Sequence, residues 1–453
     1  MQLITSDNLS VIVGLGQTGL SCARYLHANG ERFAVTDSRE KPPMLAEFRA
    51  EFADVPITLG GFDKELCLSA RRLVVNPGIS LKEPVLLAAQ DAGVHICGDI
   101  ELFARAAKAP IVGITGSNGK STVTTLLGEM AAKAGVKVAV GGNLGTPALD
   151  LLSDAVELYV VELSSFQLER CSQLGAEIAV VLNISEDHLD HHGSLLAYHQ
   201  AKHRIFQGAK QALVNRDDGL TNPLVPEEVV RWRFGFAAPD FHTFGLIKEG
   251  DETWLAFEST KLLAVSSLKM AGKHNVANAL AALALGSAVK LPMEAMLAAL
   301  VEFRGLDHRC QFVGVKNGVR FYDDSKATNV GAAVAAIEGL ATDGGEQKLV
   351  LVAGGQGKGG SYQDLIESLV KYGRSAVFIG ETAAEMDTLI GGRIPSSICS
   401  TMVEAVSTAY SQSESGDAIL LAPACASFDM FNSYIDRGQQ FQAAVAELLE
   451  GAA

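Results

Sequence analysis

The chain has 453 residues, of which 48% are hydrophobic, and this size suits a folded protein of about two to four domains. Its formal net charge of −15 excludes a nucleic acid or an anionic membrane surface as the main partner. The seven cysteines form no Cys-x-x-Cys pair, so we expect reduced core thiols and no zinc or disulfide framework.

The amino terminus and the apolar segments indicate where the protein works. MQLITSDNLS has no basic start and carries Asp7, so we expect no signal peptide. The most apolar helical pattern, residues 276–289, is shorter than the roughly 20 residues of a membrane span. We therefore predict a cytoplasmic protein with no membrane span, and we expect it to act as a monomer.

Short apolar runs alternate with helical patterns over residues 1–97. We expect strands at 11–13, 33–36, 57–59, 73–75 and 95–97, which predicts a doubly wound parallel sheet. The first turn, GLGQTG at residues 14–19, and Asp37 after the second strand are typical of dinucleotide-binding folds. Other nucleotide folds share these features and no hydride-transfer site stands out, so the sequence favours another nucleotide over NAD.

The second segment begins near Gly98 and contains IVGITGSNGKST at residues 111–122. The pattern predicts a buried strand, a glycine-rich loop and a helix, which together form a phosphate cradle. Lys120 can reach terminal phosphates, and Ser121 can ligate Mg²⁺. Ile114 replaces the first glycine of the common GxxxxGK[ST] pattern, so the loop is the variant TGSNGK[ST]. A glycine-rich turn without a ligand is the weaker alternative.

Polar side chains follow the next strands of this segment. Asn143 is the polar tip of a loop after residues 136–140. Glu162 ends the strand at 158–161, where a metal-binding carboxylate belongs, although it could instead cap the following serine turn. After the strand at 178–182 comes NISEDHLDHH. Because Mg²⁺ prefers oxygen ligands, we predict that only His188 among its histidines contacts metal.

Lys202 lies on an apolar helical stripe with Tyr198 and Ile205. Composition alone favours a lysine that extends its ammonium to solvent. The alternative is a lysine held near metal and phosphate. There an ammonium would repel Mg²⁺, whereas a carbamate would supply oxygen ligands.

Between Lys202 and the third segment, the sequence gives fewer indications of function. Short strands at 212–214, 232–234, 254–257 and 262–265 predict an edge or a small mixed sheet. Asn275 and Asn278 lie on one face at the start of a long Ala/Leu helix, either as ligand contacts or as plain helix-starting residues. A glycine hinge at Gly305 precedes charged residues that end at Arg309.

The third segment again alternates strand and helix, with strands expected at 319–322, 349–353, 376–379 and 418–422. Its polar loops follow strands, where ligands of such sheets bind. Lys326 and Lys358 are candidate anion contacts in an acidic chain. Lys358 lacks the following Ser or Thr of a second ATP loop.

These motifs occur together in the order found in the Mur ligases of peptidoglycan synthesis, which the chain resembles along essentially its full length. The marks of the superfamily, which includes the folylpolyglutamate synthases, are TGSNGKST, Glu162, EDHLD, Lys202, GKHN and Arg309. DDSKATN, GGQGKG and ACASFDMF resemble the members that add D-glutamate. The Asp-Asn-Pro-Arg motif of the diaminopimelate-adding members is absent from the sequence.

The resemblance implies three α/β domains: Rossmann-like at 1–97, P-loop NTPase-like at 98–305 and Rossmann-like at 306–453. It implies an ATP-dependent acid–amino-acid ligase that adds D-glutamate to UDP-N-acetylmuramoyl-L-alanine through an acyl phosphate. It also implies two Mg²⁺ sites and a CO₂-derived carbamate on Lys202. The third domain would swing in about Gly305.

The resemblance assigns residues to each ligand. ATP would be bound by Gly116, Ser117, Asn118, Gly119, Lys120, Ser121, Thr122, Asn275, Asn278, Arg309 and Asp324. Metal would be bound by Ser121, Glu162, His188 and Lys202, and the catalytic residues would be Lys120, Asn143, His188 and Lys202. The UDP sugar would be bound by Thr18, Asp37, Ser38, Arg39 and Gly78, and D-glutamate by Lys326, Thr328, Lys358, Ser427 and Phe428.

Three other classes of protein stay as alternatives. A folate-type or other amino-acid-adding ligase would share the ATP machinery and differ in the acceptor pocket of the third segment. A dehydrogenase would use the first glycine turn but leaves Lys120 and Glu162 unexplained. A non-enzymatic, nucleotide-gated protein would bind ATP without phosphate release that depends on both substrates.

Overall fold

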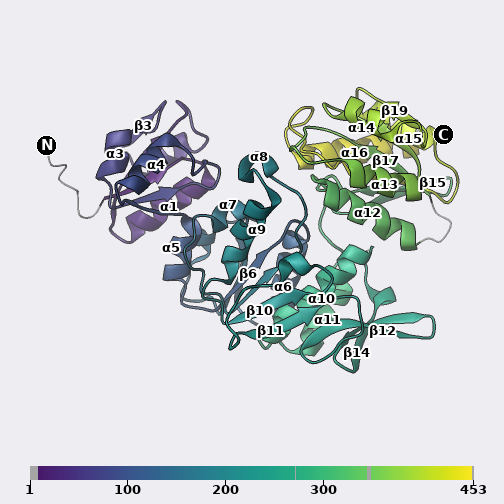
Figure 1. Cartoon of the computed structure of the whole chain (residues 1–453), viewed down its shortest axis with the longest axis horizontal. Helices are drawn as coiled ribbons and strands as arrows, with labels where there is room; N and C mark the ends of the chain where they lie inside the picture. The colour runs from purple at the N-terminus through teal and green to yellow at the C-terminus, as the bar shows by residue number, and fades with distance from the viewer. Residues whose placement is uncertain (1–8, 271, 344–347, 451–453) are drawn as a thin grey trace.

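The computed structural model describes residues 9–270, 272–343 and 348–450 and has three α/β lobes (Figure 1). Each lobe is built on its own sheet, and the sheets have five, nine and six strands. The predicted fold class is confirmed, with Rossmann-like outer lobes and a P-loop NTPase-like central lobe. Within the described ranges, no helix has both the length and the apolar character needed to cross a membrane.

The first sheet is parallel throughout, in the order β3-β2-β1-β4-β5. Alternate residues of β1 face opposite helix layers: Ile12 packs into one core cluster, and Val11 and Val13 pack into another. The elements are β1 (Leu9–Val13), α1 (Gln17–Ala28), β2 (Arg32–Asp37), α2 (Leu45–Glu51), β3 (Ile57–Leu59), α3 (Lys64–Ser69), β4 (Arg72–Val75), α4 (Pro84–Asp91) and β5 (His95–Cys97).

The central sheet has the order β14-β13-β12-β11-β10-β9-β6-β8-β7. The pairs β12–β13 and β13–β14 are antiparallel, and β13 and β14 lie at the edge of the sheet that the sequence predicted. The strands are β6 (Ile111–Thr115), β7 (Val138–Gly142), β8 (Leu158–Glu162), β9 (Ile178–Val181), β10 (Gln211–Asn215), β11 (Val230–Phe234), β12 (Thr243–Glu249), β13 (Glu252–Phe257) and β14 (Thr260–Ala264).

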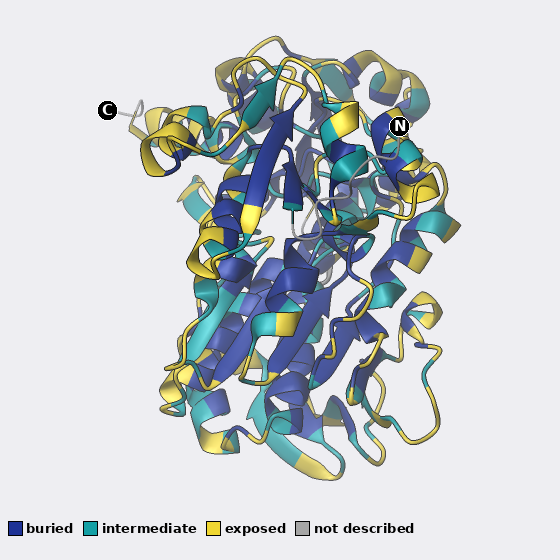
Figure 2. Cartoon of the chain, turned by 90° about the vertical axis from the view of Figure 1, so that its left-hand side faces the viewer, coloured by how far each residue is buried: buried dark blue, intermediate teal, exposed yellow. Residues whose placement is uncertain are grey.

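Helices cover both faces of the central sheet, and α6 and α10 contribute to the core on one face. Figure 2 shows the resulting burial of the sheet interior. The helices are α5 (Asp99–Ala106), α6 (Lys120–Lys133), α7 (Ser165–Leu168), α8 (Leu189–His192), α9 (Leu195–His203), α10 (Lys273–Ala288) and α11 (Met293–Glu302), with single turns η1 (Ala148–Leu151), η2 (Arg204–Phe206), η3 (Gly219–Thr221) and η4 (Val265–Ser267).

The third sheet has the order β15-β16-β20-β17-β18-β19, and only the β15–β16 pair is antiparallel. Its core lies in two clusters, one on each face. The elements are β15 (Gln311–Lys316), β16 (Val319–Asp323), α12 (Val330–Asp343), β17 (Leu349–Ala353), α13 (Gln363–Tyr372), β18 (Gly373–Phe378), α14 (Ala383–Ile390), β19 (Ser396–Ile398), α15 (Met402–Ser411), β20 (Ala418–Leu421) and α16 (Tyr434–Glu450).

Specific polar contacts join the lobes. Ser21 of α1 donates to Asp150 of η1 at 2.7 Å, which links the first lobe to the central one. The third lobe contacts the central lobe through the pair Asn118 and Asn329, at 3.1 Å between Nδ2 of Asn329 and Oδ1 of Asn118. The carboxyl edges of the central and third sheets therefore meet around the loop that follows β6.

Candidate active site

The predicted phosphate loop lies between β6 and α6. Gly119 has a φ of +82°, and a Cβ there would lie 2.4 Å from the side-chain oxygen of Asn278, so glycine is required at this point. Helix α6 begins at Lys120 without a side-chain cap, which leaves the N–H groups of its first turn free for an anion. Lys120 Nζ donates to the carbonyls of Gly116 and Ser117 at 2.8 and 2.9 Å, and burial lowers its pKa.

The segment after β9 holds this loop in place. Asn183 Oδ1 accepts from the Asn118 N–H at 2.8 Å, and its Nδ2 donates to the Asn118 carbonyl at 3.1 Å. Ser117 Oγ accepts from the N–H of Ser185 at 2.9 Å and lies 3.2 Å from the hydroxyl of Tyr198. The sequence analysis did not identify Asn183 or Tyr198 as part of the site.

Glu162 ends β8 beside the loop, where the sequence placed it. One carboxylate oxygen accepts from Asn143 Nδ2 at 2.7 Å, and the other has no hydrogen-bond partner among the described residues, although the side chain is buried. The cap of α7 is instead Ser164 with Gln167, so the alternative role of Glu162 as a turn cap is wrong. A bare buried carboxylate oxygen fits a bound cation.

Lys202 is buried in α9, with 1% of its surface exposed, so it does not extend to solvent. Its Nζ donates to the Gly116 carbonyl at 2.8 Å and lies 4.5 Å from the centre of the Tyr198 ring. Burial, followed by the charge of Lys120, lowers the pKa of Lys202 well below its usual value. The amine therefore has an environment that favours its neutral, nucleophilic form.

His188 and Asp187 form the next wall of the site. His188 has a φ of +54° at the start of α8 and packs its ring against Phe166. Burial lowers its pKa to about 4, so the imidazole is neutral near pH 7 and can bind metal. Asp187 accepts from Lys358 Nζ at 3.1 Å and from Asn329 Nδ2 at 3.2 Å, which ties the third lobe to this wall.

These walls enclose a cavity of about 310 Å³. It brings together most of the residues predicted for phosphate, metal and catalysis, from the central and third lobes. The predicted residues that line it are Ser117, Asn118, Gly119, Lys120, Ser121, Asn143, Glu162, His188, Lys202, Arg309, Lys326, Thr328 and Lys358.

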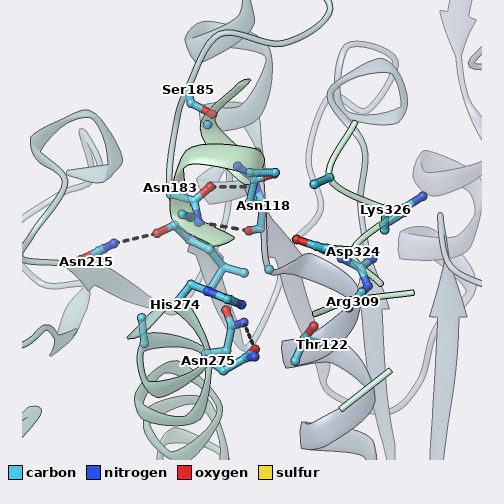
Figure 3. A pocket seen from close by; sticks show the side chains of 18 of the residues that line it. Asn118, Thr122, Asn183, Ser185, Asn215, His274, Asn275, Arg309, Asp324 and Lys326 are labelled. Atoms are coloured by element: carbon cyan, nitrogen blue, oxygen red, sulfur yellow. Dashed lines mark hydrogen bonds between the residues drawn. The ribbon is translucent and has the colours of Figure 1, made fainter. Parts of the chain in front are cut away.

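A second cavity, of about 290 Å³, opens beside the loop, and we name it the nucleotide pocket because residues predicted to contact ATP line it (Figure 3). Arg309 Nη2 donates to Ser121 Oγ at 2.7 Å across the lobe junction. Burial raises the pKa of Asp324 to about 7, with Arg309 opposing the shift. The predicted residues that line this pocket are Asn118, Gly119, Thr122, Asn275, Asn278, Arg309, Asp324 and Lys326.

A third cavity, of about 250 Å³, lies on the other side of Asp187. Thr328 and Lys358 line it, and Lys358 Nζ donates to Thr328 Oγ1 at 3.3 Å. Three predicted D-glutamate contacts are placed elsewhere. Lys326 lies at the nucleotide pocket over the Tyr434 ring, Ser427 is buried, and Phe428 is 71% exposed.

The residues predicted to bind the UDP sugar gather at the carboxyl edge of the first sheet. Asp37 ends β2 and is buried, and its carboxylate accepts from the Leu15 N–H at 2.7 Å and from Arg39 Nη2 at 2.7 Å. These hydrogen bonds lower the pKa of Asp37 against the effect of burial. Thr18 lies in the first turn of α1, Gly78 lies in the loop after β4, and Ser38 lies between Asp37 and Arg39.

Arg437 has a structural role that the sequence did not indicate. It lies in α16 with none of its surface exposed, and its guanidinium donates to the carbonyls of Ser325 and Cys425. It thus joins the loops that follow β16 and β20 in the third lobe. The only signal in the sequence was an arginine within an amphipathic helix, which normally indicates a solvated face.

Comparison with known proteins agrees with this geometry. Three family models match successive parts of the chain. They are "Mur ligase MurD-like, N-terminal domain" at residues 8–98, "Mur ligase middle domain" at 114–286 and "Mur ligase, glutamate ligase domain" at 308–425.

Relatives named UDP-N-acetylmuramoylalanine–D-glutamate ligase match the chain from end to end. The Pseudomonas aeruginosa protein is 56% identical over 448 residues, which cover 99% of this chain and 100% of that one. The Acinetobacter baylyi protein is 50% identical over 450 residues, with the same coverage.

Solved structures share the fold at lower identity. A pseudomurein peptide ligase type C from Methanothermus fervidus has a TM-score of 0.60 at 19% identity and covers 97% of this chain and 100% of its own. UDP-N-acetylmuramate–alanine ligase from Thermotoga maritima has a TM-score of 0.60 at 18% identity, with 98% and 100% covered. By its family models and its full-length relatives, the chain belongs to the Mur ligase family, among the UDP-N-acetylmuramoylalanine–D-glutamate ligases.

Proposed function

We propose that this protein joins D-glutamate to UDP-N-acetylmuramoyl-L-alanine at the expense of ATP, in cytoplasmic peptidoglycan precursor synthesis. The observation that carries the proposal is one cavity lined by the phosphate loop, by Glu162 and Lys202, and by Lys358 of the third lobe. The nucleotide pocket opens on one side of this cavity, and the third cavity, which Thr328 and Lys358 line, opens on the other. The names of the full-length relatives support the same substrates.

The reaction has two steps. The alanyl carboxylate attacks the γ-phosphorus of ATP, the bond to the β–γ bridging oxygen breaks, and ADP leaves. The amine of D-glutamate then attacks the acyl phosphate carbonyl, phosphate departs and the amine loses a proton. Lys120 and the first turn of α6 neutralise phosphate charge, and Asn143 lies near the reacting groups.

Ser121, Glu162, His188 and Lys202 are the residues that would hold Mg²⁺. The unpartnered oxygen of Glu162 and the neutral imidazole of His188 support this assignment. Mg²⁺ held by these residues would neutralise the negative charge of the reacting groups. The protein itself fixes the ligands, because Asn143 orients Glu162 and the left-handed backbone of His188 aims its ring into the cavity.

Carbamylation of Lys202 is the second part of the proposal. A neutral Lys202 amine attacks CO₂, an N–C bond forms as one C–O π bond opens, and one proton is released, which replaces the neutral amine by a carbamate anion beside Glu162. Burial of Lys202 and its lowered pKa support this step. We expect activity to fall in rigorously decarbonated buffer and to return with bicarbonate. Full activity without CO₂ would contradict it.

The remaining ligand assignments rest on position. Asn275, Asn278, Arg309 and Asp324 would contact the nucleotide, whose ribose Asp324 would bind. The UDP sugar would lie on Thr18, Asp37, Ser38, Arg39 and Gly78, and D-glutamate on Thr328 and Lys358, with Lys326, Ser427 and Phe428 reached after movement of the third lobe. The domain limits would be 1–97, 98–305 and 306–453, and the protein would act as a monomer.

The deciding experiment measures phosphate release from Mg-ATP with UDP-N-acetylmuramoyl-L-alanine. We compare D-glutamate, L-glutamate and no amino acid, with wild type and Lys120→Ala. Release with D-glutamate alone, lost in Lys120→Ala, is the expected result. Release with another acceptor in place of D-glutamate, or no release from folded protein that binds ATP, would overturn the proposal in favour of a different ligase or a non-enzymatic protein.

A further inference from the structure

Two groups of three side chains in the described structure have metal-binding atoms within 4.8 Å of one another. Both lie outside the residues that line the Mg²⁺ cavity. They differ in how far their ligand atoms are already engaged. The groups are His95, Cys97 and Glu101 near the end of the first lobe, and Glu169, His191 and His192 in the central lobe.

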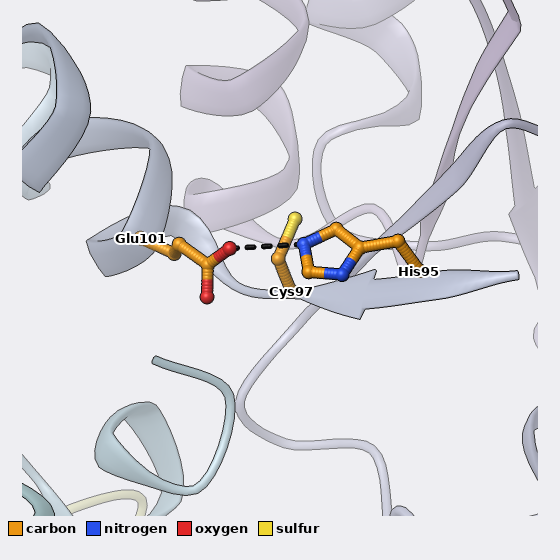
Figure 4. A group of neighbouring side chains, drawn as sticks. All are labelled: His95, Cys97 and Glu101. Carbon is orange, nitrogen blue, oxygen red and sulfur yellow. Dashed lines mark hydrogen bonds and ion pairs between the residues drawn. The ribbon is translucent and has the colours of Figure 1, made fainter. Parts of the chain in front are cut away.

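In the first group, both oxygens of Glu101 are already engaged, and Figure 4 shows the contact with His95. Glu101 Oε1 accepts from His95 Nε2 at 2.9 Å and from Arg105, and its Oε2 accepts from the Ser172 N–H at 2.8 Å. Burial raises the pKa of the Cys97 thiol to about 12, which disfavours the thiolate that a metal requires. The carboxylate and the thiol of this group are therefore poorly suited to bind a metal ion.

The second group is arranged differently. Glu169 follows α7, and its two carboxylate oxygens face two imidazoles of α8: Oε2 lies 3.2 Å from His191 Nε2, and Oε1 lies 3.3 Å from His192 Nδ1. Ligand atoms about 2.0–2.1 Å from a tetrahedral zinc ion lie roughly 3.3 Å apart. Each imidazole nitrogen thus lies at about this separation from one carboxylate oxygen, and the ligand atoms of the three residues all lie within 4.8 Å of one another.

His192 supplies the observation that points to a ligand. Its side chain is 1% exposed, and its Nδ1 makes no hydrogen bond within the described part of the chain. Its Nε2 lies 3.0 Å from Ser165 Oγ, so a proton on Nε2 toward that hydroxyl leaves the Nδ1 lone pair facing a carboxylate oxygen. In that tautomer two electron pairs face each other, and a cation between them would satisfy both.

The surroundings limit which cation fits. Phe166 packs against both rings of the pair, with centroids 4.6 Å from His191 and 5.5 Å from His192, and the Tyr198 ring lies 5.2 Å from His192. The Arg170 guanidinium lies 3.5 Å from Glu169 Oε2, but it donates to the backbone carbonyls of Phe166 and Ile79. Two nitrogens and one oxygen suit Zn²⁺ better than Mg²⁺.

We propose that Glu169, His191 and His192 form a binding site for a transition-metal ion of the Zn²⁺ class, with a water molecule as the fourth ligand. The site joins the end of α7 to α8. Because α8 starts directly after His188, an ion here fixes the backbone that carries Asp187 and His188. It is a structural site beside the catalytic cavity and takes no part in the chemistry.

The test uses Co²⁺ as the probe on the full-length chain after treatment with a chelator, in excess Mg²⁺. Tetrahedral Co²⁺ with nitrogen and oxygen ligands absorbs in the visible region, and a thiolate ligand adds a near-ultraviolet charge-transfer band. We expect one Co²⁺ per chain with the visible band and without the thiolate band. His191→Ala and Glu169→Gln should each weaken binding at least about tenfold. Zn²⁺ should compete for the site.

His95→Ala is the matched control, because it removes a histidine from the other group. It should bind Co²⁺ as wild type does, and Zn²⁺ should raise the Tm of wild type and His95→Ala but not that of His191→Ala. The metal-free Tm of each variant shows that it is folded. Unchanged Co²⁺ binding in both His191→Ala and Glu169→Gln, loss of binding in His95→Ala, or absence of a tetrahedral spectrum would overturn the proposal.

Discussion

The side chain of Lys326 lines two cavities, and the protonation of its amine changes near neutral pH. Burial, with the cations Arg309 and Lys120 nearby, lowers its pKa to about 8. A bound polyphosphate favours the ammonium and raises this pKa again. At pH 8 half of the free protein lacks the proton, so Mg-ATP binding should take up as much as about 0.5 proton. Calorimetry in buffers with different ionisation enthalpies measures this uptake.

The sign of the pH dependence follows from the same shift. Above pH 8 the free protein must gain a proton to bind ATP, so the affinity of wild type should fall as pH rises. Lys326→Gln should bind more weakly at pH 7 and lose both the uptake and this decline. Equal proton uptake in wild type and Lys326→Gln would show that another group titrates.

Gly119 is a position in the phosphate loop that does not tolerate a side chain. In Gly119→Ala, a φ of +82° costs about 1–2 kcal/mol, and the new Cβ displaces the oxygen of Asn278 in the nucleotide pocket. We expect ATP affinity, measured by titration, to fall at least about tenfold. Gly135→Ala is the control, since Gly135 has a φ of +79° and open space around it. Equal ATP affinity in the two variants would contradict the role of Asn278.

At the scale of elements, the packing of α6 on β7 reverses the usual effect of a Gly→Ala substitution in a helix. An Ala in place of a helical Gly normally stabilises by about 1 kcal/mol. At Gly128, however, a Cβ would lie 2.6 Å from Val140 Cγ2, and overpacking of this kind costs about 1–3 kcal/mol. We expect Gly128→Ala to lower the free energy of unfolding, measured with urea. In a Val140→Ala background the same change should raise it.

A continuous buried apolar run made a strand predictable from the sequence, as in β17, which has the predicted bounds. The edge strands β3 and β5 also have the predicted bounds, although they are only partly buried, because they alternate with helical patterns. The strands β12, β15 and β19 were missed. The last two are edge strands with exposed side chains such as Phe312, so no apolar run marks them. The predicted strand at 136–140 lies two residues later, because Gly141 and Gly142 pair with β8.

The site residues that could be predicted are those that belong to a local sequence motif. Lys120 and Ser121 open α6 after the glycine-rich loop that follows β6, and Glu162 ends β8, so each has a local signal in the sequence. The contacts of Asp187 with Lys358 and of Arg437 with Ser325 join residues more than a hundred positions apart. Such pairs depend on how the lobes pack, which no local pattern encodes.

At the scale of the whole molecule, the ion pair between Asp187 and Lys358 holds the third lobe against the central one. Both side chains are largely buried, at 8% and 20% exposed, so this pair is screened less than a surface pair. We expect Asp187→Asn to shift the protein without ligands toward a more open arrangement about Gly305. Small-angle scattering should then give a larger radius of gyration than for wild type.

A pair within one lobe gives the matched control for that experiment. Glu367→Gln breaks an exposed contact with Arg393 inside the third lobe, and it should leave the scattering profile unchanged. ATP together with both substrates should restore the compact profile of Asp187→Asn, because ligands bridge the same two lobes. A profile of Asp187→Asn that equals wild type without ligands would mean that the other contacts are sufficient.

The seven cysteines are all buried, and none is in a disulfide. The rate at which each thiol is alkylated can therefore report the opening of its own lobe. An alkylating reagent can reach a thiol only when the lobe around it opens, and peptide mass spectrometry assigns each adduct to its lobe. ATP should slow the alkylation of the third-lobe cysteines more than that of the first-lobe ones, since it bridges the central and third lobes. By lobe, the thiols are Cys22, Cys67 and Cys97 in the first, Cys171 in the central, and Cys310, Cys399 and Cys425 in the third.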